Sequence, residues 1–169
     1  MVEAWKQDRI GAAERGENPT VLARLRSGYA VIGDTQFLPG YCVLLAAPQV
    51  ACLEDLDLAR RTDFLMDMSL LGEAIAAACR PRRINYSIYG NADAFLHAHV
   101  FPRYDWEPEE FRRRPPWSYP ADRWTEARYQ LSACRHGALR ADLRAQLERL
   151  GGARGTGDGP ERTAGGRSR

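Results

Sequence analysis

Residues 95–104, with the sequence FLHAHVFPRY, constrain the fold of this chain more than any other segment. Apolar residues alternate there with His97 and His99, which is the pattern of a β-strand with one face in a core. Side chains two residues apart point to the same face of a strand, roughly 7 Å apart along it. The pattern therefore predicts a strand over 96–101 that presents two imidazoles side by side and stops at Pro102.

Two neighbouring imidazoles have three chemical uses. They can bind a metal ion, since H-x-H on a strand is a good pair of ligands. One ring can attack a substrate while the other stabilises the developing charge. Both can also be structural, with their nitrogens bonded to backbone carbonyls. A metal site needs a further ligand, and the third histidine, His136, is distant and lies in a predicted helix, so no metal site is predicted.

The central part of the chain supplies a small sheet and a long helix. Apolar runs at 28–33 and 41–46 flank a connection that contains Pro-Gly, which predicts an antiparallel hairpin. Apolar side chains at helical spacing predict a helix from Asp57 to Cys79, and residues 84–89 alternate as another strand. Strands and a helix in this order indicate an α+β fold.

The two ends of the chain have a different character. Residues 1–19 are mostly polar and end in Asn-Pro, after which Thr20 is a candidate cap for a short helix through Arg26. A stripe of leucines that ends at Leu150 predicts a C-terminal helix. Residues 151–169 contain almost nothing apolar, so this tail is predicted to be disordered.

Composition narrows the classes of function. The 24 basic and 22 acidic residues give a net charge of +2, and no basic stripe suits duplex nucleic acid. The four cysteines form no C-x-x-C pair, which argues against a zinc knuckle or a disulfide scaffold. Because no run resembles a signal peptide or is long enough to span a membrane, the cytoplasm is the expected compartment.

Two features beyond the histidine strand have both a functional and a structural interpretation. The tryptophans Trp106, Trp117 and Trp124 could stack on a base, but anchoring a proline-rich wrap around the domain is the simpler role. The run Arg112–Arg114 could meet a polyphosphate or RNA, yet most charge runs are solvated faces. We favour the structural interpretation of both.

The segment RINYSIYGN at 83–91, followed after four residues by LHAHVFPRY at 96–104, resembles the signature of the histidine triad (HIT) superfamily. In that family a strand that begins with Asn or Gln leads through a Gly-Asn or Gly-Gln loop into H-x-H-x-H. Residues 28–45 are similar to the family's first hairpin, and 57–79 occupy the place of its central helix. The resemblance covers about residues 20 to 110.

The resemblance implies an α+β, HIT-like fold, in which an antiparallel sheet of about five strands is combined with a long central helix and a C-terminal helical extension. The expected organisation is an N-terminal extension over 1–19, a HIT-like domain over 20–110, a C-terminal wrap and helix over 111–150 and a disordered tail over 151–169.

The resemblance also implies roles for single residues. His97 matches the nucleophile that attacks the α-phosphorus of a nucleotide and forms a covalent nucleotidyl-histidine. His99 matches the residue that holds a non-bridging phosphate oxygen. The candidate substrate-binding residues are an amide near the phosphate, two loop residues and a ribose-binding carboxylate, namely Asn85, Gly90, Asn91 and Asp34. Each of these also has a plain interpretation as a strand-edge or turn residue.

Two aromatic residues replace histidines of the family pattern. Phe95 stands at the first triad position, and Tyr41 stands where the family has a further histidine. Both positions belong behind the nucleophile, and the backbone carbonyl of residue 95 can still orient the His97 ring whatever its side chain. The replacement either exchanges a polar network for an aromatic one or marks a slow enzyme or a binding protein.

The resemblance therefore implies a hydrolase or nucleotidyl transferase acting on dinucleoside polyphosphates or nucleoside phosphoramidates. It requires no cofactor, although Mg²⁺ can accompany a polyphosphate substrate. The alternatives are a weak or inactive HIT domain that binds nucleotides and, third, a metal-dependent hydrolase that uses the H-x-H pair. A homodimer is the expected assembly, with no membrane and no specific nucleic acid as partner.

Overall fold

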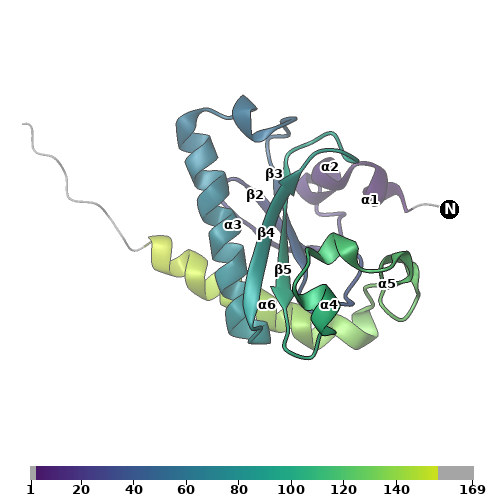
Figure 1. Cartoon of the computed structure of the whole chain (residues 1–169). Helices are drawn as coiled ribbons and strands as arrows, with labels where there is room; N and C mark the ends of the chain where they lie inside the picture. Colours follow the sequence, from purple (N-terminus) through teal and green to yellow (C-terminus); the bar gives the residue numbers. More distant parts are fainter. Residues whose placement is uncertain (1–2, 156–169) are drawn as a thin grey trace, which may run out of the picture.

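The computed structural model describes residues 3–155 and is built on a five-stranded antiparallel sheet with the order β1-β2-β3-β5-β4 (Figure 1). The strands are β1 (Val21–Arg24), β2 (Gly28–Ile32), β3 (Cys42–Ala46), β4 (Arg83–Tyr89) and β5 (His97–Arg103). The helices are α1 (Ala4–Gln7), α2 (Arg9–Glu14), α3 (Leu58–Cys79), α4 (Glu109–Arg112), α5 (Ala121–Thr125) and α6 (Ala133–Gly155), with 3₁₀ turns at Leu53–Asp55 and Pro116–Ser118. The predicted α+β fold, with its sheet, long helix and C-terminal helix, is confirmed.

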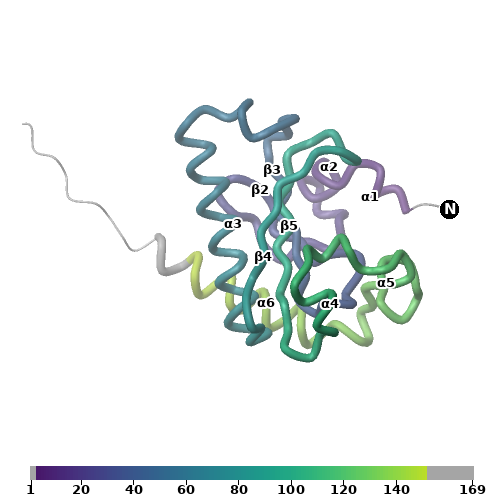
Figure 2. Tube along the Cα trace, viewed as in Figure 1, coloured from purple at the N-terminus to yellow at the C-terminus, as the bar shows by residue number. Residues whose placement is uncertain are grey.

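One face of the sheet is covered by α3 and α6, which pack against each other (Figure 2). Asp57 caps α3, since its carboxylate accepts the N–H of Arg60 at 2.9 Å. Ala98 and Val100 of β5 are fully buried on this face, as the alternation in the sequence predicts. The largest buried side chains that join them there come from β3, α3 and α6: Leu44, Phe64, Leu71, Ile75, Leu143 and Leu147.

The opposite face of the sheet is covered only at its two ends. At one end α2 packs the buried Ile10 against Val31 and Leu45. At the other end, the segment after β5 covers Tyr41 and Phe101 with aromatic side chains. Figure 1 shows these two covers, α1 and α2 above and α4 and α5 below, on the same side of the strands. The part of β5 that carries the histidines lies between them.

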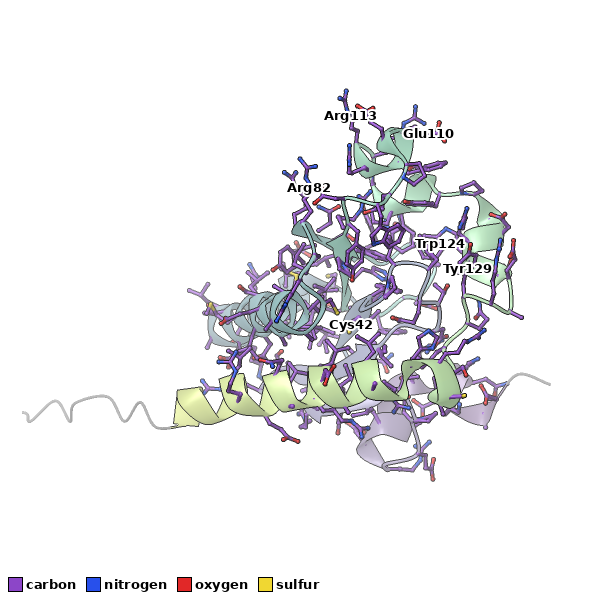
Figure 3. The ribbon with its side chains drawn as sticks, turned by 90° about the horizontal axis from the view of Figure 1, so that it is seen from below. Cys42, Arg82, Glu110, Arg113, Trp124 and Tyr129 are labelled. Carbon is purple, nitrogen blue, oxygen red and sulfur yellow. The ribbon has the colours of Figure 1, made fainter. Side chains whose placement is uncertain are left out.

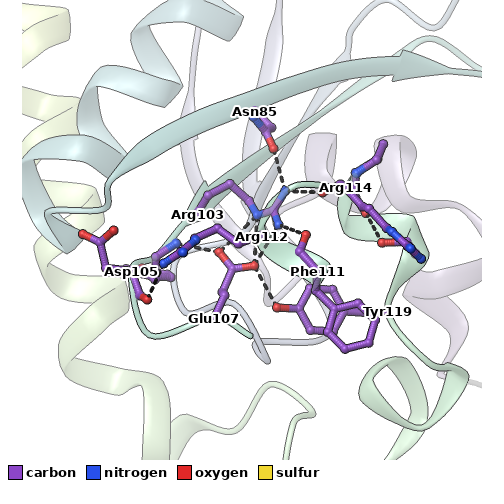
Figure 4. A network of polar contacts seen from close by, with 11 residues as sticks. Asn85, Arg103, Asp105, Glu107, Phe111, Arg112, Arg114 and Tyr119 are labelled. Carbon is purple, nitrogen blue, oxygen red and sulfur yellow. Dashed lines mark hydrogen bonds and ion pairs between the residues drawn. The ribbon is translucent and has the colours of Figure 1, made fainter. Parts of the chain in front are cut away.

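A buried ion pair holds the second cover in place (Figure 4). Arg103 and Glu107 are 2.9 Å apart, and their side chains are 3% and 0% exposed. The guanidinium also donates to three oxygens of neighbouring segments, those of the Asn85 side chain and of the Phe111 and Arg114 carbonyls. The carboxylate accepts from the N–H of Tyr104 and the hydroxyl of Tyr119. Every polar atom of the pair therefore has a partner, which is what a buried pair requires.

Two local predictions are wrong. The segment 20–26 contains the strand β1 (Val21–Arg24) instead of a short helix, because pairing with β2 buries Leu22 in the core, and such tertiary contacts override weak helix propensity. The strand with the histidines also continues through Pro102 to Arg103. β3 begins opposite Val100, so the missing N–H of Pro102 removes no hydrogen bond to β3.

The ends of the chain have more structure than their composition indicates. The N-terminal extension forms α1 and α2, and α2 packs on the sheet through Ile10. Helix α6 confirms the leucine stripe and continues past Leu150 to Gly155, while the rest of the predicted disordered tail lies outside the described residues. In the part that the structure describes, no helix combines the length and apolar character needed to cross a membrane.

Candidate functional site

His97 is held in one orientation by the backbone of its own strand. Its ring is buried at 6% exposure, and Nδ1 lies 2.8 Å from the carbonyl oxygen of Phe95. A carbonyl oxygen can only accept a hydrogen bond, so Nδ1 carries the proton. In the neutral ring this leaves the lone pair on Nε2. The prediction that the carbonyl of residue 95 orients His97 is confirmed.

His99 is held by a phenol. Its Nδ1 lies 2.7 Å from the hydroxyl of Tyr41, which has no other hydrogen-bond partner among the described residues. Burial keeps the pKa of Tyr41 well above its usual range, so the phenol keeps its proton and is able to donate it to Nδ1. Burial, together with the neighbouring His97, lowers the pKa of His99 to about 4. At neutral pH His99 is therefore an uncharged ring, and in the tautomer in which Tyr41 donates to Nδ1 its N–H lies at Nε2.

The two rings meet at right angles, with their centroids 4.8 Å apart, beside a pocket of about 290 Å³. One wall of the pocket is apolar and includes Val31, Leu45 and Phe95. The rim is charged, because Asp34 and Arg9 form an ion pair at 2.5 Å there. An apolar wall with a few polar groups is typical of a site for a flat organic ligand.

A second pocket, of about 470 Å³, opens on the other side of the histidines. It shares both rings, Asp93 and Trp117 with the first pocket, and Asn91 lies at its edge. The histidine pair therefore stands where two pockets meet, and a ligand longer than one pocket has to pass both rings.

The predicted substrate-binding residues separate into two groups. Asp34 lines the first pocket and Asn91 the second. Asn85 lies on the same sheet face, opposite Phe101, but its amide oxygen accepts from Arg103 outside both pockets. Gly90 borders a different hollow, on the side of Leu96. The structure thus brings two of the four to the histidines.

Arg9 and Trp117 line the site, although no role was predicted for Arg9 and an anchoring role was favoured for Trp117. Arg9 belongs to the polar N-terminal segment and reaches the pocket because α2 is packed on the sheet. Trp117 stacks on Trp124 at 4.9 Å, as expected of an anchor, and its ring is also 4.9 Å from that of His99. The only available signal was the concentration of tryptophans after the histidine strand.

The described residues contain no cluster of three or more His, Cys, Asp or Glu side chains that could hold a metal ion. His97 and His99 thus have no third ligand of these types at metal-binding distance. Both Nδ1 atoms are already engaged, by Phe95 and Tyr41. This geometry gives the metal-dependent alternative little support.

We expect the stability of the fold to fall between about pH 6.5 and pH 4 on account of His99. In the unfolded chain this ring takes up a proton near the ordinary imidazole pKa of about 6.5, whereas the folded ring does so only at about 4. The unfolded state therefore binds more protons in this window, and the free energy of unfolding drops by an amount on the order of 2 kcal/mol. Above about pH 6.5 this contribution is constant.

Urea denaturation of the wild type and of His99→Gln at several pH values measures this effect. Carboxylates titrate in both proteins, so the difference between the two curves isolates His99. A difference that stays constant from pH 7 to 4 would contradict a neutral, buried ring.

No protein-family model and no curated protein sequence matches this chain. Solved structures do match. A histidine triad protein from Bradyrhizobium japonicum is 17% identical, with a TM-score of 0.63 over 80% of this chain and 95% of that chain. A hypothetical histidine triad nucleotide-binding protein from Sulfolobus tokodaii is 15% identical, with a TM-score of 0.64 over 88% and 95%. A zinc-bound histidine triad family protein from Mycobacterium smegmatis is 21% identical, with a TM-score of 0.53 over 84% and 94%.

Proposed function

We propose that this chain, which has the fold of histidine triad proteins, is a hydrolase or nucleotidyl transferase that acts on nucleotide phosphoanhydrides or phosphoramidates. The observation that carries the proposal is a pair of adjacent imidazoles, each held at Nδ1 by a different partner. The Phe95 carbonyl leaves the lone pair of His97 on Nε2, and we assign His99 the tautomer in which Tyr41 donates to Nδ1 and Nε2 carries the N–H. A nucleophile beside a fixed donor is what transfer at phosphorus requires.

In the first step the Nε2 lone pair of His97 attacks the α-phosphorus. A P–N bond to His97 forms, the P–O or P–N bond to the leaving group breaks, and the leaving group departs with the electron pair; a leaving amine also takes up a proton from solvent. The Nε2–H of His99 donates to a non-bridging oxygen as negative charge develops there. His97 becomes a positively charged, nucleotidylated ring whose Nδ1–H still donates to the Phe95 carbonyl.

In the second step water attacks the same phosphorus. A new P–O bond forms, the P–N bond breaks, and its electron pair returns to Nε2 of His97. The water loses its surplus proton to solvent, and a nucleoside monophosphate leaves. If an alcohol or phosphate replaces the water, the outcome is nucleotidyl transfer.

The first pocket supplies the place for the nucleoside. Its apolar wall accepts a base, and the Asp34 carboxylate, oriented by Arg9, is available to the ribose hydroxyls. The nucleotide-binding description of the Sulfolobus tokodaii protein supports a nucleotide as ligand. No cofactor enters these steps, although Mg²⁺ can accompany a polyphosphate. A homodimer in the cytoplasm remains part of the proposal.

A nucleotide-binding protein without turnover is the second candidate. It is favoured by Phe95 and Tyr41, which replace the imidazoles expected behind the nucleophile. The pocket, His97 and His99 could bind a nucleotide equally well without turnover. Turnover, and not binding, therefore discriminates between the two candidates.

The test is incubation with diadenosine tetraphosphate and with a fluorogenic adenosine phosphoramidate, each with and without EDTA. Release of AMP from either substrate, unaffected by EDTA, supports the proposal. AMP binding without turnover of either substrate would instead support the second candidate. Turnover abolished by EDTA, in a protein that retains zinc, would support a metal-dependent hydrolase.

Replacing Tyr41 with phenylalanine should lower kcat/KM about tenfold, the effect of one lost hydrogen bond of ordinary strength. The ring itself should stay in place, because it stacks on Phe101 at 4.0 Å. Without the phenol proton, His99 is free to adopt the tautomer that has no N–H at Nε2. Steady-state kinetics combined with ¹⁵N NMR of the histidine tautomers measure both effects.

Tyr29→Phe is the matched control for this variant, since Tyr29 lies on β2 outside the pocket. It should leave both the rate and the tautomer unchanged. If the His99 tautomer is the same in Tyr41→Phe as in the wild type, the Tyr41 hydroxyl does not set the tautomer of His99.

A further inference from the structure

A groove rich in arginine continues from the histidine site along β4. It has a volume of about 450 Å³ and shares Tyr89 and Trp117 with the second histidine pocket. Its basic wall contains Arg83 from β4 and the run Arg112–Arg114 from the segment at the end of α4. We call it the arginine groove.

The arginine groove and the histidines belong to one continuous face of the sheet. Ser87 of β4 pairs with His99 of β5, and Tyr89 pairs with His97. Alternate residues of a strand share a face, so Arg83 lies on the same face as these side chains. From Ser87 to Arg83 the strand advances about 13 Å, at roughly 3.3 Å per residue. A ligand that starts at the histidines and follows β4 therefore reaches Arg83 only if it is long.

The charge of the groove is only partly compensated. Arg103 is neutralised by Glu107, and Arg113 pairs with Glu109 at 2.6 Å. Figure 3 places Arg113 and Glu110 together at the outer tip of this segment, away from the sheet.

Three arginines of the groove remain without a carboxylate. Among the described residues, neither Arg83 nor Arg114 forms an ion pair, and Arg112 donates to the backbone carbonyl of Asp105. Three guanidinium groups around one groove repel one another unless an anion lies between them. Arginine binds phosphate oxygens through two parallel hydrogen bonds, so phosphate is the anion that suits the groove best.

We propose that the arginine groove is a subsite for the phosphates of the leaving group, with Arg83 and Arg114 as the residues that bind them. This inference rests on the proposed function. The first nucleoside occupies the pocket beside Asp34, and its α-phosphate meets His97 and His99. The following phosphates run along β4 to Arg83 and Arg114, and the rings of Tyr89 and Trp117 offer surfaces for the second base. The small leaving group of a phosphoramidate does not extend that far.

Binding measured by calorimetry on His97→Ala tests the subsite without turnover. Diadenosine tetraphosphate should bind at least about tenfold more tightly than AMP, since charge-assisted phosphate contacts are strong ones. Arg83→Gln combined with Arg114→Gln should abolish this excess while the affinity for AMP stays the same. The excess should also shrink at high salt, because exposed charges are screened.

Arg26→Gln combined with Arg60→Gln is the matched control, since it removes the same charge from a pocket away from the histidines. In this control variant diadenosine tetraphosphate should still bind more tightly than AMP. Equal affinities for AMP and the tetraphosphate, or an excess that survives in Arg83→Gln/Arg114→Gln, would overturn the subsite and leave the proposed function standing. Loss of AMP affinity in that double variant would also overturn it. If the wild type binds no nucleotide at all, the proposed function itself fails.

Discussion

Replacing His97 with alanine should lower kcat/KM on a turned-over substrate by roughly three to six orders of magnitude. The variant lacks the atom that forms the P–N bond, and no other histidine can take its place. His99 lies beside it, but its Nδ1 is bonded to Tyr41, and in the assigned tautomer its Nε2 carries the proton and has no lone pair to offer. Initial rates of AMP release measure the loss. Affinity for AMP should change little by comparison, because the nucleoside pocket is intact.

His136→Ala is the matched control. This histidine lies on α6, away from both pockets, so the rate should be close to that of the wild type. A rapid acid-free quench of the wild type should yield protein with the added mass of one adenylyl group, and His97→Ala should not. Turnover retained in His97→Ala would exclude a nucleotidyl-histidine at this position.

The part of the site that depends on strand periodicity could be predicted from the sequence. Leu96, Ala98 and Val100 have to enter a core, and a strand then leaves His97 and His99 no choice of face. The orientation of His97 followed as well, because its partner is a backbone carbonyl two residues away. The alternation of the sequence was sufficient to predict the face on which the histidines lie, and the backbone of the same strand was sufficient to predict the orientation of His97.

Contacts between distant segments could not be predicted in the same way. Arg9 reaches the pocket because one neighbour, Ile10, is buried on the sheet, and a single isoleucine in a polar segment has no recognisable period. The β1 strand is four residues long and depends on β2 for its stability, so its own sequence did not distinguish it from a helix. Tyr41 was expected behind the nucleophile, and only the coordinates show that its hydroxyl bonds His99.

The buried ion pair of Arg103 and Glu107 should contribute strongly to the stability of the fold. Glu107→Ala should lower the free energy of unfolding by about 3–5 kcal/mol, the usual effect of leaving a buried charge without its partner. Total stabilities are only about 5–15 kcal/mol, so this is a large fraction. Urea denaturation at pH 7 measures it. Glu109→Ala, which breaks the exposed pair with Arg113 on the neighbouring helix, should lower the stability by less than about 1 kcal/mol.

A double variant, Arg103→Met with Glu107→Leu, separates the effect of an unpaired buried charge from the effect of losing the hydrogen bonds that Arg103 donates. If the cost of Glu107→Ala came only from an orphaned charge, removing both charges would restore most of the stability. We expect little recovery, because Arg103 also donates to the partly buried carbonyls of Phe111 and Arg114, which methionine cannot do. Those carbonyls belong to the segment that leads directly into the turn with Trp117, so the wall of both pockets should loosen and KM should rise. Full recovery of stability with an unchanged KM would mean that the network does not position this wall.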